Sequence, residues 1–305
     1  MTLVMLGLAE AALRVFGIGG MVVFTRHPDW GFLMTPSQTV RVYGHSVVIN
    51  ALGLRGPEVR APKPPGGIRI LFLGDSVTYG GGSLREEQLF VRRVESAARA
   101  LGVDAETVNV SAPAWSPQNW ARYVDARGLL GADILVVVIP ECDFARPFAT
   151  IESGGHQVEV PWFRIGSLVL KVKNTLARRP PLRSFARPVP KSGLQPGPLE
   201  DEIVAANLDA LRRVRNRAGL LPMLTVMVPS PALAFERLWS RFKAEAGEVL
   251  DLRPELDDPK FFTDGVHLNA RGHEIVGERI FSKMRSFLKA QTAGSSDLSA
   301  GGVTR

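Results

Sequence analysis

A serine at the end of an apolar run is the first residue whose type and position suit catalysis. The segment Ile68 to Gly82, IRILFLGDSVTYGGG, has the pattern of a buried strand up to Gly74, followed by Asp75 and Ser76. Open parallel sheets build their sites at the carboxyl ends of strands, and the N–H of a serine that starts a helix can stabilise an oxyanion. Walker and GxGxxG spacings are missing from the segment, which excludes a phosphate loop. Most serines in such positions are helix caps, so this segment alone does not establish a nucleophile.

A second segment, near the other end of the chain, supplies an acid and a base. In Phe261 to Gly272, FFTDGVHLNARG, Asp264 precedes His267 by three positions, just before a predicted helix. One turn of backbone can bring the carboxylate against the imidazole, fix its tautomer and leave the other ring nitrogen free as a base. The simpler interpretation is a capped helix with an ordinary polar histidine. Ser76 in the same chain favours the catalytic interpretation.

The two segments together resemble those of the SGNH/GDSL hydrolases. LFLGDSVTYG matches the nucleophile block and DGVHLNARGH the Asp–His block, while VNVSAPAWS and VVVIPECD match the two blocks between them more loosely. Block order and strand spacing agree along roughly residues 66 to 290. The resemblance implies a flavodoxin-like three-layer sandwich with a central parallel sheet. It also implies that Ser76 is the nucleophile, His267 the general base and acid, and Asp264 the residue that orients His267.

The resemblance further implies an oxyanion hole, in which this chain departs from the family pattern. The family uses the N–H of the nucleophile, here Ser76, a backbone N–H at a glycine and an asparagine side chain. Here Ala114 and Cys142 stand in place of the glycine and the asparagine. Alanine keeps the N–H if the turn needs no positive φ, but a thiol is a weak donor. Losing one donor lowers turnover by about 10² to 10³ in an unrelated protease, and Asn119 and Asn50 are candidates to fill the gap.

The other polar and aromatic candidates have simpler interpretations. Trp115 flanks the second block, where it lines a substrate pocket or, as is more common beside a helix, packs in the core. The remaining histidines have no acid or cysteine at metal-ligand spacing: His27, His45, His156 and His273. One cysteine excludes an internal disulfide framework. No metal or organic cofactor is implied.

Short apolar strands alternate with helical segments from residue 66 onward. Strands are predicted at 68–74, 108–110, 132–139 and 220–228, and helices near 84–101, from 117, and near 200–218, 233–246 and 270–289. Continuous apolar strands linked by helices indicate an α/β fold with a parallel sheet covered on both faces. Upstream, residues 38–50 alternate apolar and polar on either side of Gly44, which predicts a β-hairpin.

Four parts of the chain differ in composition. They are a hydrophobic helix at 1–24, a leader with the hairpin at 25–65, the hydrolase-like domain at 66–290 with an insert at about 145–199, and a tail at 291–305. The tail has nothing to bury and is expected to be disordered. Over all 305 residues, 45% are hydrophobic and 22% charged, which disfavours wholesale disorder and a multi-span membrane protein.

The N-terminal 24 residues are mostly apolar but are interrupted by Glu10 and Arg14. A bilayer span needs about 20 apolar residues, and the printed run falls short of that. Two interpretations remain. The segment is either the end of a membrane anchor that begins upstream, with Glu10 and Arg14 paired near the interface, or an amphipathic helix packed on the domain. The first is favoured, because an apolar leader before a globular domain more often tethers than packs.

The basic charge of the chain is concentrated in the insert. The net charge is +7, and residues 160–199 carry eight Lys and Arg and no acid, which leaves −1 for the rest. The insert is either a solvated surface excursion with a short helix at 163–176, the favoured interpretation, or a patch for anionic lipid or acidic polysaccharide. A nucleic-acid partner is not expected, because the globular part is close to neutral.

The function implied is hydrolysis of an ester through an acyl-serine intermediate. From the resemblance, the substrate is an acylated carbohydrate or a lipid-like ester. LAEAALRVFG and VVINALGLRGPE also resemble the leader of bacterial members tethered outside the cytoplasmic membrane, which predicts an extracytoplasmic location; a cytoplasmic one is the alternative. Two other functions stay open: an O-acyltransferase that uses a sugar hydroxyl as acceptor, and a catalytically silent relative that binds glycan or lipid.

Overall fold

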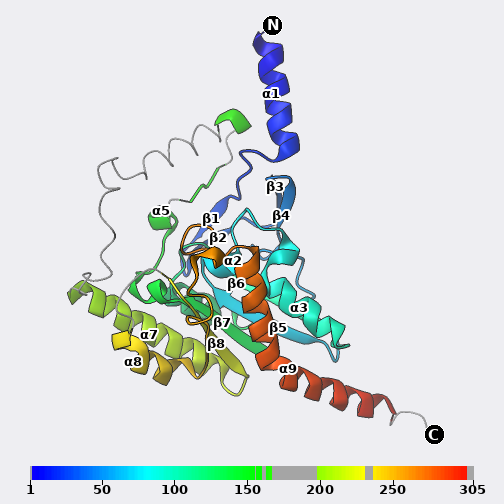
Figure 1. The fold of residues 1–305 in the computed structure, drawn as a ribbon, viewed down its shortest axis with the longest axis vertical. Helices are drawn as coiled ribbons and strands as arrows, with labels where there is room; N and C mark the ends of the chain where they lie inside the picture. Colours follow the sequence, from blue (N-terminus) through cyan, green and yellow to red (C-terminus); the bar gives the residue numbers. More distant parts are fainter. Residues whose placement is uncertain (1, 155, 160–162, 167–197, 231–235, 301–305) are drawn as a thin grey trace.

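A five-stranded parallel sheet forms the centre of the protein (Figure 1). The computed structural model describes residues 2–154, 156–159, 163–166, 198–230 and 236–300. The strands of the sheet are β5 (Ile68–Gly74), β6 (Ala105–Ser111), β7 (Ile134–Pro140), β8 (Met223–Val228) and β9 (Glu248–Asp251). Their order, β6-β5-β7-β8-β9, is the flavodoxin-like order in which the second strand lies outside the first. The predicted α/β fold class is confirmed.

Helices cover both faces of this sheet (Figure 1). The helices that pack on it are α3 (Phe90–Ala100), α4 (Pro117–Arg127), α7 (Pro198–Ala218), α8 (Glu236–Ala246) and α9 (Ala270–Ala300). Two four-residue helices, α2 (Ser76–Tyr79) and α5 (Ile151–Gly154), lie in connecting segments. Side chains alternate along β5, so Ile70 and Phe72 pack in the core cluster that includes residues of α3 and α9, while Leu71 and Leu73 pack in the one with α4, α7 and α8. Two apolar cores on opposite faces make the three-layer sandwich.

Three of the elements differ from the sequence prediction. The helix expected from about residue 84 begins at Phe90, because Leu89 is in an extended conformation and the residues before it form a 3-10 turn, Glu86–Gln88. Strand β9 was not predicted, since it has only four residues, one exposed and three partly buried, which leaves little apolar pattern. Helix α9, expected near 270–289, runs to Ala300 and so extends into the tail that was expected to be disordered.

The leader contains two hairpins. The predicted one is confirmed as β3 (Gln38–Val42) paired with β4 (His45–Ile49). The other, β1 (Phe24–His27) with β2 (Gly31–Met34), was not predicted, because each strand has only four residues. Phe32 of β2 is fully buried in the same core cluster as α4 residues. The leader is therefore part of the packed domain.

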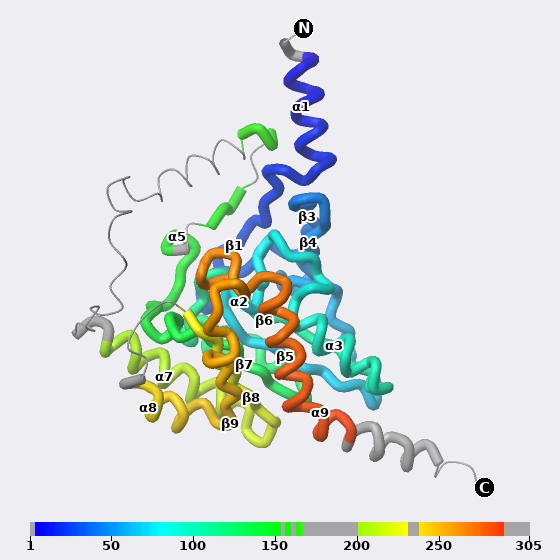
Figure 2. The backbone as a smooth tube through the Cα atoms, in the orientation of Figure 1, coloured from blue at the N-terminus to red at the C-terminus, as the bar shows by residue number. Residues whose placement is uncertain are grey.

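Helix α1 (Thr2–Phe16) extends away from the domain (Figure 2). Large apolar side chains are exposed along it: Val4, Met5, Leu6, Leu8, Val15 and Phe16. The Arg14 Nε donates to the Glu10 carboxylate over 2.7 Å, the pairing expected from the sequence. Across the described residues, no helix combines the length and the apolar character that a membrane span requires. The helical pattern at 163–176 lies mostly outside the described residues, as does most of the basic insert.

Candidate active site

The turn from β5 into α2 sets the position of Ser76. Gly74 has no room for a side chain, because a Cβ there would lie 1.9 Å from Oγ1 of Thr78. The Asp75 side chain then caps the helix, its Oδ1 accepting the N–H of Val77 over 2.8 Å. Ser76 is consequently the first residue of α2 and lies at the carboxyl end of a fully buried strand. This is the position that the strand pattern predicted.

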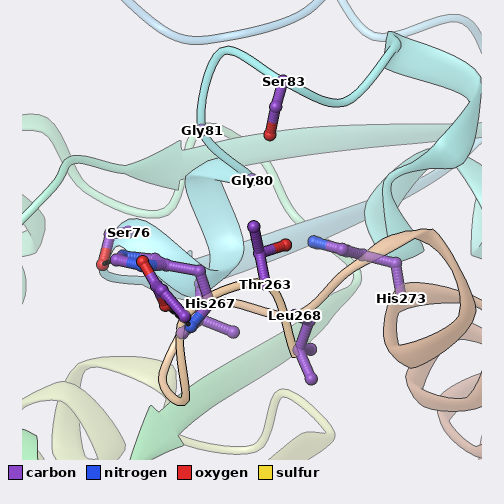
Figure 3. Close-up of a pocket in the computed structure, with 10 residues that line it drawn as sticks. Ser76, Gly80, Gly81, Ser83, Thr263, His267, Leu268 and His273 are labelled. Carbon is purple, nitrogen blue, oxygen red and sulfur yellow. Dashed lines mark hydrogen bonds and ion pairs between the residues drawn. The ribbon is translucent and has the colours of Figure 1, made fainter. Parts of the chain in front are cut away.

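Ser76, His267 and Asp264 form a continuous series of hydrogen bonds. Figure 3 shows the side chains of Ser76 and His267 next to each other. The Nδ1 of His267 lies 2.8 Å from Oδ2 of Asp264, and its Nε2 lies 2.9 Å from Oγ of Ser76. An ionised carboxylate only accepts, so Nδ1 carries the ring proton and the neutral ring accepts the Ser76 hydroxyl at Nε2. The arrangement can therefore deprotonate Ser76 and hold the resulting imidazolium against a carboxylate.

A short, tightly bonded loop presents His267. The Thr263 N–H donates to the His267 carbonyl over 2.8 Å, which closes the loop. Oδ1 of Asp264 accepts the N–H groups of Val266 and His267 within it. Partial burial opposes ionisation, but these bonds together with the ring of His267 lower the pKa of Asp264 below its ordinary value. Asp264 thus remains an acceptor for the imidazole, although its side chain is 56% exposed.

The backbone N–H groups of Ser76 and Ala114 are the two donors that the resemblance implies for an oxyanion. In the described part of the chain, no hydrogen bond engages the N–H of Ser76 or that of Ala114. Ala114 has a φ of 66°, in the left-handed region that favours glycine. The sequence predicts that Ala114 keeps its N–H as a donor if the turn needs no positive φ. The turn does have a positive φ at Ala114, so that condition is not met. Ala114 adopts this φ at a cost of roughly 1 kcal/mol.

Cys142 and the two asparagines do not replace the missing side-chain amide. Burial, and next the charge of Asp143, raises the pKa of Cys142 to about 12, so it is a neutral thiol. The Asn119 side chain bonds to Trp30 and Ala149 and caps its own helix. Asn50 caps a turn of the leader by accepting the N–H groups at positions 52 and 54. Both amides are thus used to hold the leader and its neighbouring segments together.

An arginine that the sequence analysis did not single out lies beside Ser76. Nη1 of Arg146 donates to Oδ2 of Asp75 over 2.9 Å and lies 2.8 Å from Oδ1 of Asp143, and its Nη2 lies 3.4 Å from Sγ of Cys142. Both carboxyl groups are fully buried, while 29% of the arginine side chain is exposed. A signal for Arg146 was present in the sequence. The segment ECDFARP directly follows an apolar strand pattern, and Arg146 comes four residues after Cys142 in it.

Opposing charges determine the ionisation of this cluster. Burial, and next the charge of Asp75, raises the pKa of Asp143 well above its ordinary value. Burial alone would lower the pKa of Arg146, but the carboxyl groups of Asp143 and Asp75 raise it above its ordinary value. The cluster therefore holds the guanidinium of Arg146 between two buried carboxyl groups, one of them directly before the serine.

A cavity of about 180 Å³ opens beside Ser76 and His267 (Figure 3). The loop with Gly80, Gly81 and Ser83 forms one side of it, and Thr263 and Leu268 contribute to its lining. Trp115 lies elsewhere: it is fully buried in the core, and its Nε1 donates to the carbonyl of Phe32 over 3.1 Å. The structure therefore assigns Trp115 to packing, because its polar group is already bonded inside the core.

His273 also lines this cavity, although the sequence suggested only a packed histidine. Its Nδ1 accepts the N–H of Phe90 over 3.2 Å, and its ring stacks on Phe90. Burial, followed by the charges of Arg55 and Arg93, lowers the pKa of His273 to about 3. His273 is therefore a neutral structural histidine that happens to reach the cavity. Within the described residues, no group of three acidic, histidine or cysteine side chains has the arrangement of a metal site.

No protein-family model matches the sequence, and no curated protein is similar to it in sequence. Solved structures are similar to it at low identity. A lipase/acylhydrolase from Enterococcus faecalis is 15% identical, with 72% of this chain and 96% of that chain covered and a TM-score of 0.43. A lipolytic protein of the G-D-S-L family from Veillonella parvula DSM 2008 is 12% identical, with 71% and 97% covered and a TM-score of 0.41.

A two-domain esterase active on acetylated mannans is 14% identical to this chain, with a TM-score of 0.44. The similarity covers 73% of this chain but 50% of that one.

Proposed function

We propose that this chain is a serine-dependent ester hydrolase of the SGNH/GDSL type. The observation that carries the proposal is the 2.9 Å contact between Oγ of Ser76 and Nε2 of His267, with Asp264 on the other ring nitrogen. A serine hydroxyl is a weak nucleophile until a base takes its proton, and a base acts efficiently when a third group holds its orientation. All three parts lie beside one cavity.

The reaction runs in two steps. Oγ of Ser76 bonds to the carbonyl carbon of the ester, its proton moves to Nε2 of His267, and the carbonyl electrons move onto the oxygen. We assign the N–H groups of Ser76 and Ala114, which make no hydrogen bond in the described part of the chain, as donors to this oxyanion. Its collapse expels the alcohol, which takes the proton from His267 and leaves an acyl-serine. Water then bonds to the acyl carbon while His267 takes its proton. The second tetrahedral intermediate collapses by breaking the bond to Oγ of Ser76, which takes the proton back from His267 as the acid leaves.

The substrate is an acylated carbohydrate or a lipid-like ester with a short acyl group. A volume of about 180 Å³ is below the roughly 300 to 1,000 Å³ of pockets that bury drug-sized ligands, so it suits a small group better than a long chain. Polar groups of the loop with Ser83 and of Thr263 line part of the cavity, which also suits a compact ester.

The test combines turnover with active-site labelling. Purified protein is incubated with 4-nitrophenyl acetate and, separately, with a fluorophosphonate probe, and both reactions are repeated with Ser76→Ala. We expect the wild type to hydrolyse the ester and become labelled, and the variant to do neither. Ser96→Ala, which changes an exposed serine of α3, is the matched control and keeps its labelling. A folded wild type that is inert in both assays would favour a silent glycan- or lipid-binding relative.

We also propose that α1 attaches the protein to a membrane surface outside the cytoplasm. Six large apolar side chains of α1 are at least 50% exposed, among them Leu8 at 64% and Phe16 at 63%. Leaving them in water is unfavourable, whereas an interface buries them and the positive charge of residues 160–199 suits anionic lipid.

Flotation with phosphatidylglycerol vesicles tests the membrane proposal. Leu6→Glu combined with Leu8→Glu should release the protein from the vesicles. Leu220→Glu alters a fully exposed leucine distant from α1 in sequence, and it should leave binding intact. Equal binding by all three proteins would show that α1 does not form the contact.

A further inference from the structure

The guanidinium of Arg146 lies within reach of the reacting atoms. Oδ2 of Asp75 lies 3.3 Å from the hydroxyl oxygen of Ser76 and accepts Nη1 of Arg146 at 2.9 Å. The hydroxyl oxygen and Nη1 can therefore be no farther apart than these two distances combined. The carbonyl oxygen of a bound ester lies close to the serine oxygen that attacks its carbon, and an ester bound with this oxygen on the Asp75 side of Ser76 brings it toward Arg146.

Arg146 also occupies the side of the site where a donor is missing. Its Nη2 lies 3.4 Å from Sγ of Cys142, the side chain that stands where the resemblance implies an amide. A thiol cannot replace that amide as a strong donor. A guanidinium carries five N–H groups, and the contacts made to the described residues leave some of them for a substrate atom.

Resting on the proposed ester hydrolysis, we infer that Arg146 is the third oxyanion donor of this site, taking the place of the side-chain amide that Cys142 lacks. The oxygen becomes negative as Ser76 adds to the carbonyl, and the charged guanidinium then binds it more strongly than it binds the neutral ester. Interactions that strengthen in this way raise turnover more than they raise substrate affinity.

Two buried acids fix the position of the Arg146 guanidinium, as an oxyanion donor requires. Oxyanion donors act best when they are already in place, because no reorganisation is then needed during the reaction. Asp75 and Asp143 both contact Nη1 of Arg146. Asp75 directly follows β5, and Asp143 lies in the 3-10 turn Glu141–Ala145 that follows the neighbouring strand β7. In the described residues, Oδ2 of Asp143 has no hydrogen-bond partner, whereas its Oδ1 contacts Arg146 and Cys142.

Four variants test the inference by steady-state hydrolysis of 4-nitrophenyl acetate. Arg146→Gln should lower kcat by about 10² with little change in KM, since one transition-state donor is lost. Cys142→Asn in the wild-type background should change kcat by less than about threefold. The same change made together with Arg146→Gln should recover at least about tenfold, because the amide then supplies the donor. Arg69→Gln removes another buried arginine, at the opposite end of β5, and should leave kcat unchanged.

Loss of Arg146 leaves buried acids without their partner, so thermal unfolding accompanies each measurement. If Arg146→Gln does not fold, the same comparison is made in an Asp143→Asn background: Asp143→Asn with and without Arg146→Gln, each with Cys142 retained and with Cys142→Asn. Two results would overturn the inference and leave the proposed hydrolysis intact. One is an equal kcat with and without Arg146 when Cys142 is retained. The other is the same gain in kcat from Cys142→Asn whether Arg146 is present or replaced. A wild type without turnover or fluorophosphonate labelling overturns the proposed hydrolysis and the inference with it.

Discussion

The hydroxyl of Ser76 lies 2.9 Å from the imidazole of His267, although 191 positions separate these residues in the chain. They come from opposite ends of the domain: Ser76 follows the first strand of the sheet, and His267 precedes its last helix. The sheet order places β5 next to β7 and leaves the carboxyl end of β5 open to the loop before α9 (Figure 2). The predictions below depend on this contact and on the groups around it.

Asp264→Asn should lower kcat on 4-nitrophenyl acetate by about 10² to 10⁴, because an amide can donate to Nδ1 and so favour the tautomer that cannot accept the serine proton. Fluorophosphonate labelling should slow in parallel. Asp258→Asn changes another capping acid in the same region, whose side chain accepts the Lys260 N–H, and should leave both rates unchanged. A comparable loss in both variants would indicate a general disturbance of the loop.

Acyl length should control the rate, because the cavity at Ser76 measures about 180 Å³. Among 4-nitrophenyl esters, acetate and propionate should have the highest kcat/KM, and octanoate should be at least about tenfold poorer. The comparison is made below the solubility limit of each ester. Rates that increase steadily from acetate to octanoate would mean that the acyl chain binds outside this cavity.

Ala114→Gly should stabilise the fold by about 0.5 to 1 kcal/mol, because glycine adopts the φ of 66° without the steric cost that alanine bears. Turnover should be retained, since the N–H at this position is kept. Urea unfolding provides the free energies. Ala97→Gly, in the right-handed helix α3, is the matched substitution and should destabilise by about 1 kcal/mol. The same sign at both positions would contradict the strain assigned to Ala114.

The stability of the protein should fall in acid because of His273. Its pKa is about 3 when folded and about 6.5 when unfolded, so the unfolded state binds an additional proton between these values. The contribution of His273 to the free energy of unfolding is complete above about pH 6.5 and is lost as the pH falls toward 3. Between these values, this group lowers the free energy of unfolding by about 1.4 kcal/mol per pH unit. Urea unfolding between pH 4 and 7 should show a flatter dependence for His273→Gln than for the wild type. Parallel curves for the two proteins would mean that His273 titrates normally.

The segments around Ser76 and His267 could be identified from sequence because their signals are local. The apolar run of β5 ends directly before Asp75, and Asp264 and His267 are only three residues apart. The alternation of strands and helices likewise predicted a parallel sheet with helices on both faces. The four-residue strands β1, β2 and β9 escaped prediction, since each is too short to form a periodic pattern.

The surroundings of the site were harder to predict because they depend on contacts between distant segments. Asn119 was a candidate donor from its position beside the second block, but it bonds to Trp30 and Ala149. Trp115 was a candidate for the pocket, but it donates to Phe32 of the leader. In both cases the partner lies on an element far away in sequence, and the packing of the leader on the domain decides where the side chain is used.

The sequence by itself determined the strand and helix pattern, the serine at the end of the first central strand and the acid paired with a histidine before the last helix. Only the tertiary structure decided that Arg146 stands beside Cys142 and Asp75, and that Ala114 takes a left-handed conformation. The reason is physical: a helix cap or a spacing of three residues is governed by neighbours along the chain. The partner of a buried charge is governed instead by which strand ends the sheet brings together.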